Sequence, residues 1–239
     1  MPGMLVLALA VLLATSAATA SEPALDAFAQ LPADPSPPAL IRDSHYWISN
    51  EDHLGLFHEA VKDKGGLYLG VGSDQNYLLG AWARAELLVL MDFDQSIVDL
   101  HRVYRVIFLA AETPEDFLRL WRRENRAELR RLIAEGYPDK KERAGALRAL
   151  GTARGAVERR LNRVVEQMAK ASLPCFLVDA AEYAHIRRLY QEDKVFMVRG
   201  DLTARRTVSA IGRAAARRLS AGSIPWSTAL RSMCSSGAT

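Results

Sequence analysis

The stretch Gly66-Leu67-Tyr68-Leu69-Gly70-Val71-Gly72-Ser73-Asp74-Gln75-Asn76-Tyr77 decides the fold expected of this chain. A short apolar run ends in two glycines one residue apart, and polar residues then lead into a helical pattern over 77–86. This order predicts a strand, a tight turn and a helix. In a parallel sheet such a turn lets the backbone approach a ligand closely and points the start of a helix at it.

Two later strands repeat this arrangement, with an acid after each. The apolar run 87–91 ends in Asp92-Phe93-Asp94, and the run 194–199 ends in Gly200-Asp201-Leu202-Thr203. Continuous apolar runs are typical of parallel strands covered on both faces. Helical patterns follow over 96–110 and 205–219. Asp92 stands about 20 residues beyond the glycine turn, the spacing at which dinucleotide sites place an acid on the ribose. We therefore predict that the strand ends at Gly72, Asp92 and Asp201 converge on one crevice.

The other segments predict mainly helices. Ser49 and Asp52 fit a capping box before a helix over 54–61, which Gly65-Gly66 would end. We expect a short strand over 176–178, a helix over 182–191 and a helical insertion over 113–171. The arginines of the insertion could suggest a polyanion site, but interleaved glutamates favour a solvated, ion-paired face. These arginines are Arg122, Arg123, Arg126, Arg130 and Arg131.

Length and composition limit the possible functions. The chain has 239 residues, enough for one full core, and its net charge of +3 is too small to indicate a nucleic-acid partner. Two cysteines do not make a disulfide framework. His53 and His58 are five residues apart, so they do not share a helix face as a metal pair would. We expect no nucleic acid and no metal.

The N-terminus resembles an export signal. An apolar run over 4–14 precedes Ala18-Thr19-Ala20, a small-residue cleavage site, although no Lys or Arg precedes the run. We predict a signal peptide over 1–20, a proline-rich linker over 21–44, one domain over 45–219 and a disordered tail over 220–239. The protein would then be periplasmic or secreted, without a stable membrane span after cleavage, or cytoplasmic if the signal is not functional.

The glycine turn also limits the cofactor. The third glycine of a dinucleotide fingerprint would fall at Gln75, which counts against NAD and against an oxidoreductase. S-adenosylmethionine has no pyrophosphate and needs only the close approach at Gly70 and Gly72, with an acid for its ribose. We therefore predict a small nucleotide-type ligand. Asp74, Gln75 and Asn76 could contact it or could only cap the helix, and Asp92 could likewise be a cap.

Three segments carry a resemblance to a known family: Gly65 to Tyr77, Ser49-Asn50-Glu51 and Val198-Arg199-Gly200-Asp201-Leu202-Thr203. Over about 46–219 the chain resembles a family of largely uncharacterised bacterial proteins with a class I methyltransferase-like Rossmann fold. The resemblance implies an α/β fold with a mostly parallel sheet. It also implies an S-adenosylmethionine-type site in which Gly70 and Gly72 face the methionine part, Asp92 the ribose and Asp201 the adenine. The cofactor-contacting set would be Gly70, Gly72, Asp74, Gln75, Asn76, Asp92, Asp94, Gly200 and Asp201.

Two departures from the family pattern shape the functional prediction. Phe93-Asp94-Gln95 replaces the basic residues often found after the second strand's acid. The family's closing strands and its Ser-Asn-x-Glu-x-Tyr segment do not follow residue 219. We therefore expect a sheet that is incomplete at the C-terminus, with an open edge that a partner or second copy could cover. The chain would be a methyltransferase-like protein of doubtful activity with no catalytic residue identified. The alternative is an exported, non-catalytic binding protein that reuses the fold.

Overall fold

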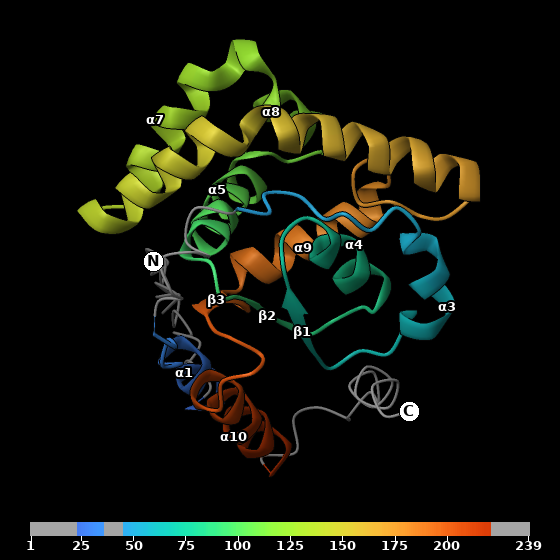
Figure 1. The fold of residues 1–239 in the computed structure, drawn as a ribbon. Helices are drawn as coiled ribbons and strands as arrows, with labels where there is room; N and C mark the ends of the chain where they lie inside the picture. The colour runs from blue at the N-terminus through green and yellow to red at the C-terminus, as the bar shows by residue number, and fades with distance from the viewer. Residues whose placement is uncertain (1–22, 36–44, 221–239) are drawn as a thin grey trace, which may run out of the picture.

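The computed structural model describes residues 23–35 and 45–220. It shows a mixed α/β protein built on a three-stranded parallel sheet (Figure 1). The predicted signal peptide and the tail from residue 221 lie outside the described residues. No helix in the described ranges combines the length and the apolar character that a membrane crossing requires.

The three strands form where the apolar runs predict them, at the glycine turn and at 87–91 and 194–199. They are β1 (Leu67–Val71), β2 (Leu87–Asp92) and β3 (Val195–Arg199), in the order β1-β2-β3. Every residue of the central strand β2 is buried, as its continuous apolar run indicates. In the register Val71 pairs with Met91 and Asp92 pairs with Arg199, so the carboxyl ends of all three strands lie at one edge. Among the described residues, β1 pairs with β2 alone.

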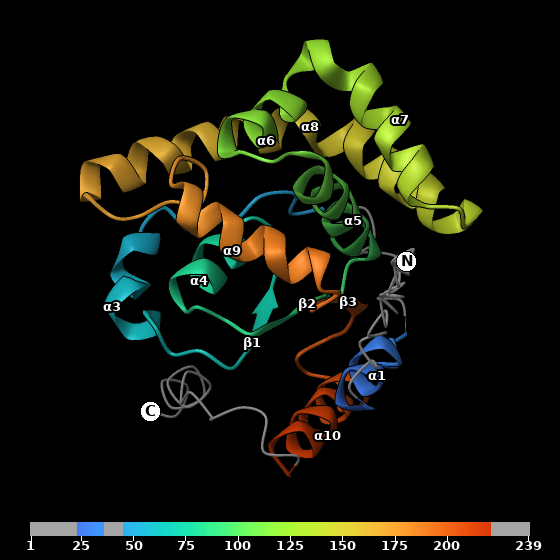
Figure 2. The ribbon, with the colours of Figure 1, turned by 180° about the vertical axis from the view of Figure 1, so that it is seen from behind.

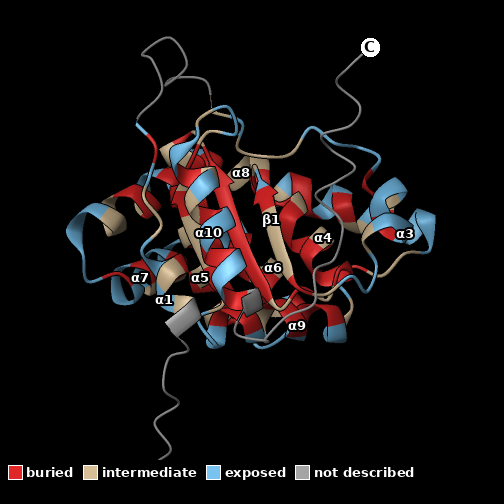
Figure 3. Cartoon of the chain, turned by 90° about the horizontal axis from the view of Figure 1, so that it is seen from below, coloured by how far each residue is buried: buried red, intermediate tan, exposed pale blue. Residues whose placement is uncertain are grey.

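Helices cover both faces of the sheet (Figures 1 and 2). Leu88 and Leu90 point into a large core formed with one set of helices, whereas Leu87, Val89 and Met91 point into a smaller core on the other face. The large-core helices include α4 (Gln75–Trp82), α5 (Gln95–Ala110), α6 (Pro114–Trp121), α7 (Arg126–Gly136), α8 (Lys140–Ala171) and α9 (Ala180–Gln191). The smaller core is formed with α1 (Pro23–Ala29) and α10 (Arg206–Ser220), which cross in front of the strands in Figure 3.

The predicted insertion over 113–171 is helical throughout most of its length. It consists of α6, the short 3-10 helix η2 (Arg123–Asn125), α7 and the long helix α8. Thr113 and Asp139 cap α6 and α8 by accepting backbone N–H groups of the first turn. α8 packs closely against α5, so the insertion shares the main core.

Three sequence predictions are wrong in detail. The described part of the predicted linker contains the helix α1. Its Phe28 is buried against α10, because a short amphipathic helix can cover this face of the sheet. Ser49 and Asp52 form no capping box. The first helical turn instead begins with η1 (Leu54–Phe57), which leads into α3 (His58–Val61) and has no side-chain cap. Residues 176–178 form a turn rather than a strand, because Phe176 and Leu177 are buried among the helices.

Candidate functional site

The glycine turn after β1 is tightly packed against the chain's own side chains. Gly72 has φ of +86°, a left-handed conformation that glycine adopts without strain. A Cβ atom at Gly70 would clash with the side chains of Asn76 and Tyr68. Glycine at position 70 is therefore required by internal packing.

The side chains of Gln75 and Asn76 fill the inside of the turn. Asn76 Nδ2 donates to the carbonyl oxygens of Val71, Gly72 and Ser73 at 3.2, 3.1 and 3.2 Å. Asn76 Oδ1 accepts from the Tyr68 hydroxyl at 3.1 Å. Gln75 Nε2 donates to Val71 O at 2.7 Å. The sequence left open whether both residues contact a ligand or cap the helix. The observed contacts go instead to the carbonyl oxygens of the turn, and α4 has no side-chain cap hydrogen bond.

Asp92 lies beside the glycine turn, as the parallel register requires. Its carboxylate accepts from the N–H of Asp94 at 2.8 Å and from the N–H groups of Gly72 and Phe93. Burial raises the pKa of Asp92 to about 6, and the nearby negative charge of Asp94 adds to this shift. In the described part of the chain, no basic side chain forms an ion pair with Asp92. Asp92 is therefore a nearly buried carboxylate without a cation.

Asp94 has two structural contacts. Its Oδ1 accepts from the N–H of Ser96 at 2.8 Å and so caps α5. Its Oδ2 lies 2.6 Å from Nδ1 of His45, whose ring contacts that of Trp47 in a tilted arrangement. Of the two acids at the end of β2, Asp92 thus accepts from backbone N–H groups, whereas Asp94 caps α5 and contacts His45.

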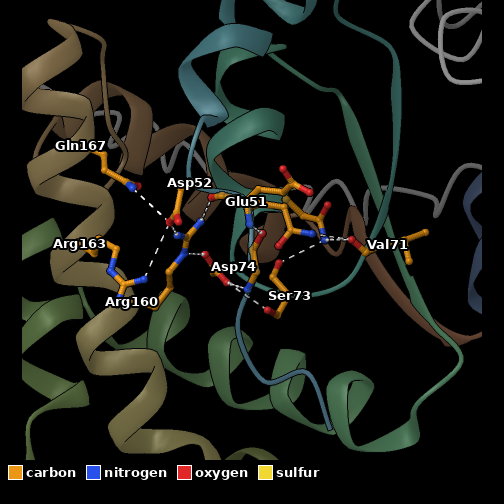
Figure 4. Close-up of polar contacts among 11 residues, drawn as sticks. Glu51, Asp52, Val71, Ser73, Asp74, Arg160, Arg163 and Gln167 are labelled. Carbon is orange, nitrogen blue, oxygen red and sulfur yellow. Dashed lines mark hydrogen bonds and ion pairs between the residues drawn. The ribbon is translucent and has the colours of Figure 1, made fainter. Parts of the chain in front are cut away.

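Asp74 faces away from Asp92's strand and toward the helical insertion (Figure 4). Its Oδ2 accepts from Nε of Arg160 on α8 at 2.9 Å, and both side chains are nearly inaccessible, at 2% and 0% exposure. Its Oδ1 accepts from the N–H of Ser49 at 2.7 Å. Arg160 also donates to the carbonyl oxygen of Glu51 at 2.7 Å. The buried ion pair therefore joins the glycine turn, α8 and the segment 45–53.

The segment 45–53, here called the strap, runs along the carboxyl edge of the sheet. It is held at His45 by Asp94, at Ser49 by Asp74 and at Glu51 by Arg160. Asp52 adds weaker contacts to Arg160 and Arg163 of α8, at 3.5 and 3.9 Å, which Figure 4 shows as dashed lines. The strap thus occupies polar groups that the sequence assigned to a ligand.

The third strand end is organised separately. Gly200 N donates to Asp92 O at 2.9 Å, and a Cβ at Gly200 would clash with Met91. The Asp201 carboxylate accepts from the N–H and hydroxyl of Thr203, within its own turn. Its backbone N–H donates to the buried carboxylate of Asp34 at 3.0 Å. Asp201 lies at the same edge as Gly72 but two strands away, so its distance from the glycine turn is about 10 Å or more.

A buried hydrogen-bonded chain supports the glycine turn from below. His101 on α5 lies 2.8 Å from the carbonyl oxygen of Gly72 through Nε2, and 2.8 Å from the Tyr77 hydroxyl through Nδ1. Tyr77 continues the chain to the hydroxyl of Tyr190 at 2.9 Å. Burial lowers the pKa of His101 to about 4, so the ring is neutral. A carbonyl oxygen only accepts, so Nε2 carries the proton and Nδ1 accepts from Tyr77.

Sequence reasoning missed two of these residues, Arg160 and Asp34. A signal for Arg160 exists: it stands three residues after Val157 and four before Val164, on the apolar face of α8, where a charged residue needs a buried partner. For His101 the sequence predicts a partly buried or surface position and no catalytic role, whereas the residue is fully inaccessible. No comparable pattern marks Asp34, which lies far from its partners in the sequence.

The carboxyl edge of the sheet is acidic and has few free hydrogen-bond donors. The N–H of Gly72 is used by Asp92, and the amides of Gln75 and Asn76 are used within the turn. The described residues contain no group of three or more side chains that could hold a metal ion. The edge can therefore accept hydrogen bonds from hydroxyl or ammonium groups, and it offers little to an anion.

The fold and this edge define an α/β protein with a parallel sheet and an acidic, strap-covered carboxyl end. The chain belongs to the family described as Domain of unknown function (DUF7790), whose profile matches residues 46–221. No curated protein matches the chain.

Proposed function

We propose that this protein has a Rossmann-like, class I methyltransferase-like architecture and binds S-adenosylmethionine or a closely related nucleoside at the carboxyl edge of the sheet. One observation carries the proposal: Asp92 ends the strand next to the glycine turn and has no basic partner in the described chain. A carboxylate in this place can accept both hydroxyl protons of a ribose. Asp92 is thus the proposed ribose-binding residue.

The charge of the edge supports a ligand without phosphates. Asp74, Asp92 and Asp94 all lie at the ends of β1 and β2, while the donors of the turn are already used. A pyrophosphate would be repelled here and would find few free N–H groups. S-adenosylmethionine is a cation at its sulfonium and carries no phosphate, so it suits the charge of this edge better than NAD or ATP does.

Calorimetric titration of the full chain tests the proposal. S-adenosylmethionine, its demethylated product and adenosine are titrated separately, with NAD and ATP for comparison. We expect binding of the first two and no binding of the phosphorylated ligands. Asp92→Asn should weaken binding by about 10- to 100-fold, the usual effect of losing hydrogen bonds to a charged group. Glu86→Gln, at the other end of the same strand, should leave affinity unchanged. The proposal would be refuted if neither S-adenosylmethionine nor its demethylated product bound, or if the Asp92→Asn and Glu86→Gln variants had equal affinity for them.

A second candidate is an exported binding protein without catalytic activity. It is favoured by the strap, which already satisfies Asp74 and Asp94, and by the turn that Gln75 and Asn76 fill. The predicted export signal agrees with this candidate, because S-adenosylmethionine is made in the cytosol. Cell fractionation with N-terminal sequencing distinguishes the two. A cytosolic protein with an uncleaved N-terminus would remove the main support for this candidate.

A further inference from the structure

The exposed face of α10 carries charges of one sign. The helix contains four arginines and no Asp or Glu. Its apolar residues Ile211, Ala214 and Ala215 are buried in the smaller core on the sheet. Figure 3 shows exposed positions along the side of α10 that faces away from the strands. α10 is therefore an amphipathic helix whose charged side chains at the solvent side are all cations.

Three exposed arginines lie in one row along this face. They are Arg206, Arg213 and Arg217. Their spacings of seven and four residues correspond to about two turns and about one turn, so the three side chains leave the helix on the same side, over a length of about 16 Å. The exposed residues between them are small, namely Ser209, Gly212 and Ala216. A flat anionic surface can therefore approach all three guanidinium groups closely.

The chain supplies little negative charge to neutralise this row. In the described ranges none of the three arginines forms an ion pair with a carboxylate within 4.0 Å, although Arg206 lies near the buried Asp34. Residues 1–22, 36–44 and 221–239 lie outside those ranges. Their charged side chains are two acids and two arginines, Glu22, Asp43, Arg42 and Arg231, so these segments add no net negative charge. The row is thus able to attract an anionic partner from outside the chain.

A membrane with anionic lipids fits this face better than a nucleic acid does. The described chain begins with α1, which packs against α10. The apolar run over 4–14, predicted as an export signal, is separated from Pro23 by residues 15–22. Extended residues span at most about 3.5 Å each, so a bilayer that holds this run would lie within about 30 Å of α1. The predicted route of export would therefore bring α10 to a phospholipid surface.

We propose that α10 binds the surface of an anionic phospholipid bilayer through the row of Arg206, Arg213 and Arg217, while its apolar face stays on the sheet. Anionic headgroups attract basic side chains near the surface, and each such residue raises the affinity about fivefold. Among the described side chains of α10 no large apolar one is exposed. The contact is therefore electrostatic and peripheral, without insertion of the helix into the bilayer.

Co-sedimentation of the full chain with vesicles tests the proposal. One set of vesicles is phosphatidylcholine alone, and the other contains about one-third phosphatidylglycerol, which supplies the negative charge. The neutral vesicles measure any binding by the apolar run over 4–14. We expect at least tenfold tighter binding to the anionic vesicles. This difference should disappear in about 1 M salt, where the Debye length falls to about 3 Å.

Two triple variants separate the charge of the row from its other properties. Arg206→Gln, Arg213→Gln and Arg217→Gln combined should weaken binding to anionic vesicles at least tenfold. Lysine at the same three positions keeps the charge and should bind within about threefold of the wild type. The matched control combines three exposed arginines of the insertion, Arg123→Gln, Arg126→Gln and Arg130→Gln, and should leave the affinity nearly unchanged.

Three outcomes would overturn the proposal. The first is equal affinity for neutral and anionic vesicles, and the second is an equal loss of affinity in the two glutamine triple variants. The third is tighter binding of duplex DNA than of anionic vesicles, which would assign the row to a nucleic acid. Because the row lies on α10 and not at Asp92, none of these results depends on S-adenosylmethionine binding.

Discussion

Replacing Arg160 with methionine tests how strongly the helical insertion holds the glycine turn. The variant removes a guanidinium that is fully buried and leaves the Asp74 carboxylate, 2% exposed, without its cation. It also removes the donor to the carbonyl of Glu51. Breaking a buried ion pair from one side costs about 3–5 kcal/mol, since the remaining charge stays desolvated. We expect Arg160→Met to lower the free energy of unfolding by about 4 kcal/mol.

Urea unfolding at pH 7, followed by circular dichroism, measures this loss. Arg159→Met is the matched control, because its neighbouring side chain is exposed and should change stability by less than about 0.5 kcal/mol. The double variant with Asp74→Asn should regain part of the loss, since no unpaired charge then remains. If Arg160→Met were no more destabilising than Arg159→Met, the buried pair would not hold the turn, and the coupling inferred here would be wrong.

Four further predictions concern the glycine turn, the two titrating groups Asp92 and His101, and the thiol of Cys175. Gly70→Ala should destabilise the protein by about 1–3 kcal/mol through overpacking, whereas Gly151→Ala, in open space on α8, should be neutral or stabilising; both are read from urea midpoints. The raised pKa of Asp92, about 6, means that stability is lost as the pH rises through 6. The free energy of unfolding of Asp92→Asn, relative to that of the wild type, should therefore be about 2 kcal/mol higher at pH 8 than at pH 4, as measured by thermal melting. The lowered pKa of His101, about 4, acts oppositely: stability is lost as the pH falls from 6.5 to 4, and His101→Gln should flatten this slope. Burial raises the pKa of the Cys175 thiol to about 11, so a thiol reagent should label Cys175 only after unfolding.

The sequence predicted correctly those strands whose signal lies within a few neighbouring residues. The continuous apolar run of β2 predicted a strand covered on both faces, and Leu88 and Val89 do point into opposite cores. The spacing of Gly72 and Asp92 predicted neighbouring strand ends, which the parallel register confirms. By contrast, the apolar run at Phe176 looked like a strand, but burial among helices satisfies its side chains without any sheet partner.

The roles of the candidate site residues could be predicted less well from the sequence. The sequence left open whether Asn76 contacts a ligand or caps the helix, and only the three carbonyl oxygens around its amide show that it fills the turn. For Asp74 the sequence left open a ligand contact or a helix cap, and it did not indicate the ion pair because Arg160 stands 86 positions later in an arginine-rich segment. In the sequence, only its place on the apolar face of α8 separates Arg160 from the solvated arginines of this segment, and only the packed structure shows its partner.

By itself, the sequence determined the order of strands and helices, the place of the glycine turn and the acids that follow the strands, because periodicity and turn chemistry act over a few residues. The tertiary structure alone decided which of those acids have a side-chain partner. Asp74 meets Arg160 and Asp94 meets His45, whereas Asp92 meets only backbone N–H groups in the described chain. Such pairings join residues that are distant along the chain, and their strength depends on burial, which exists only after the helices have packed on the sheet.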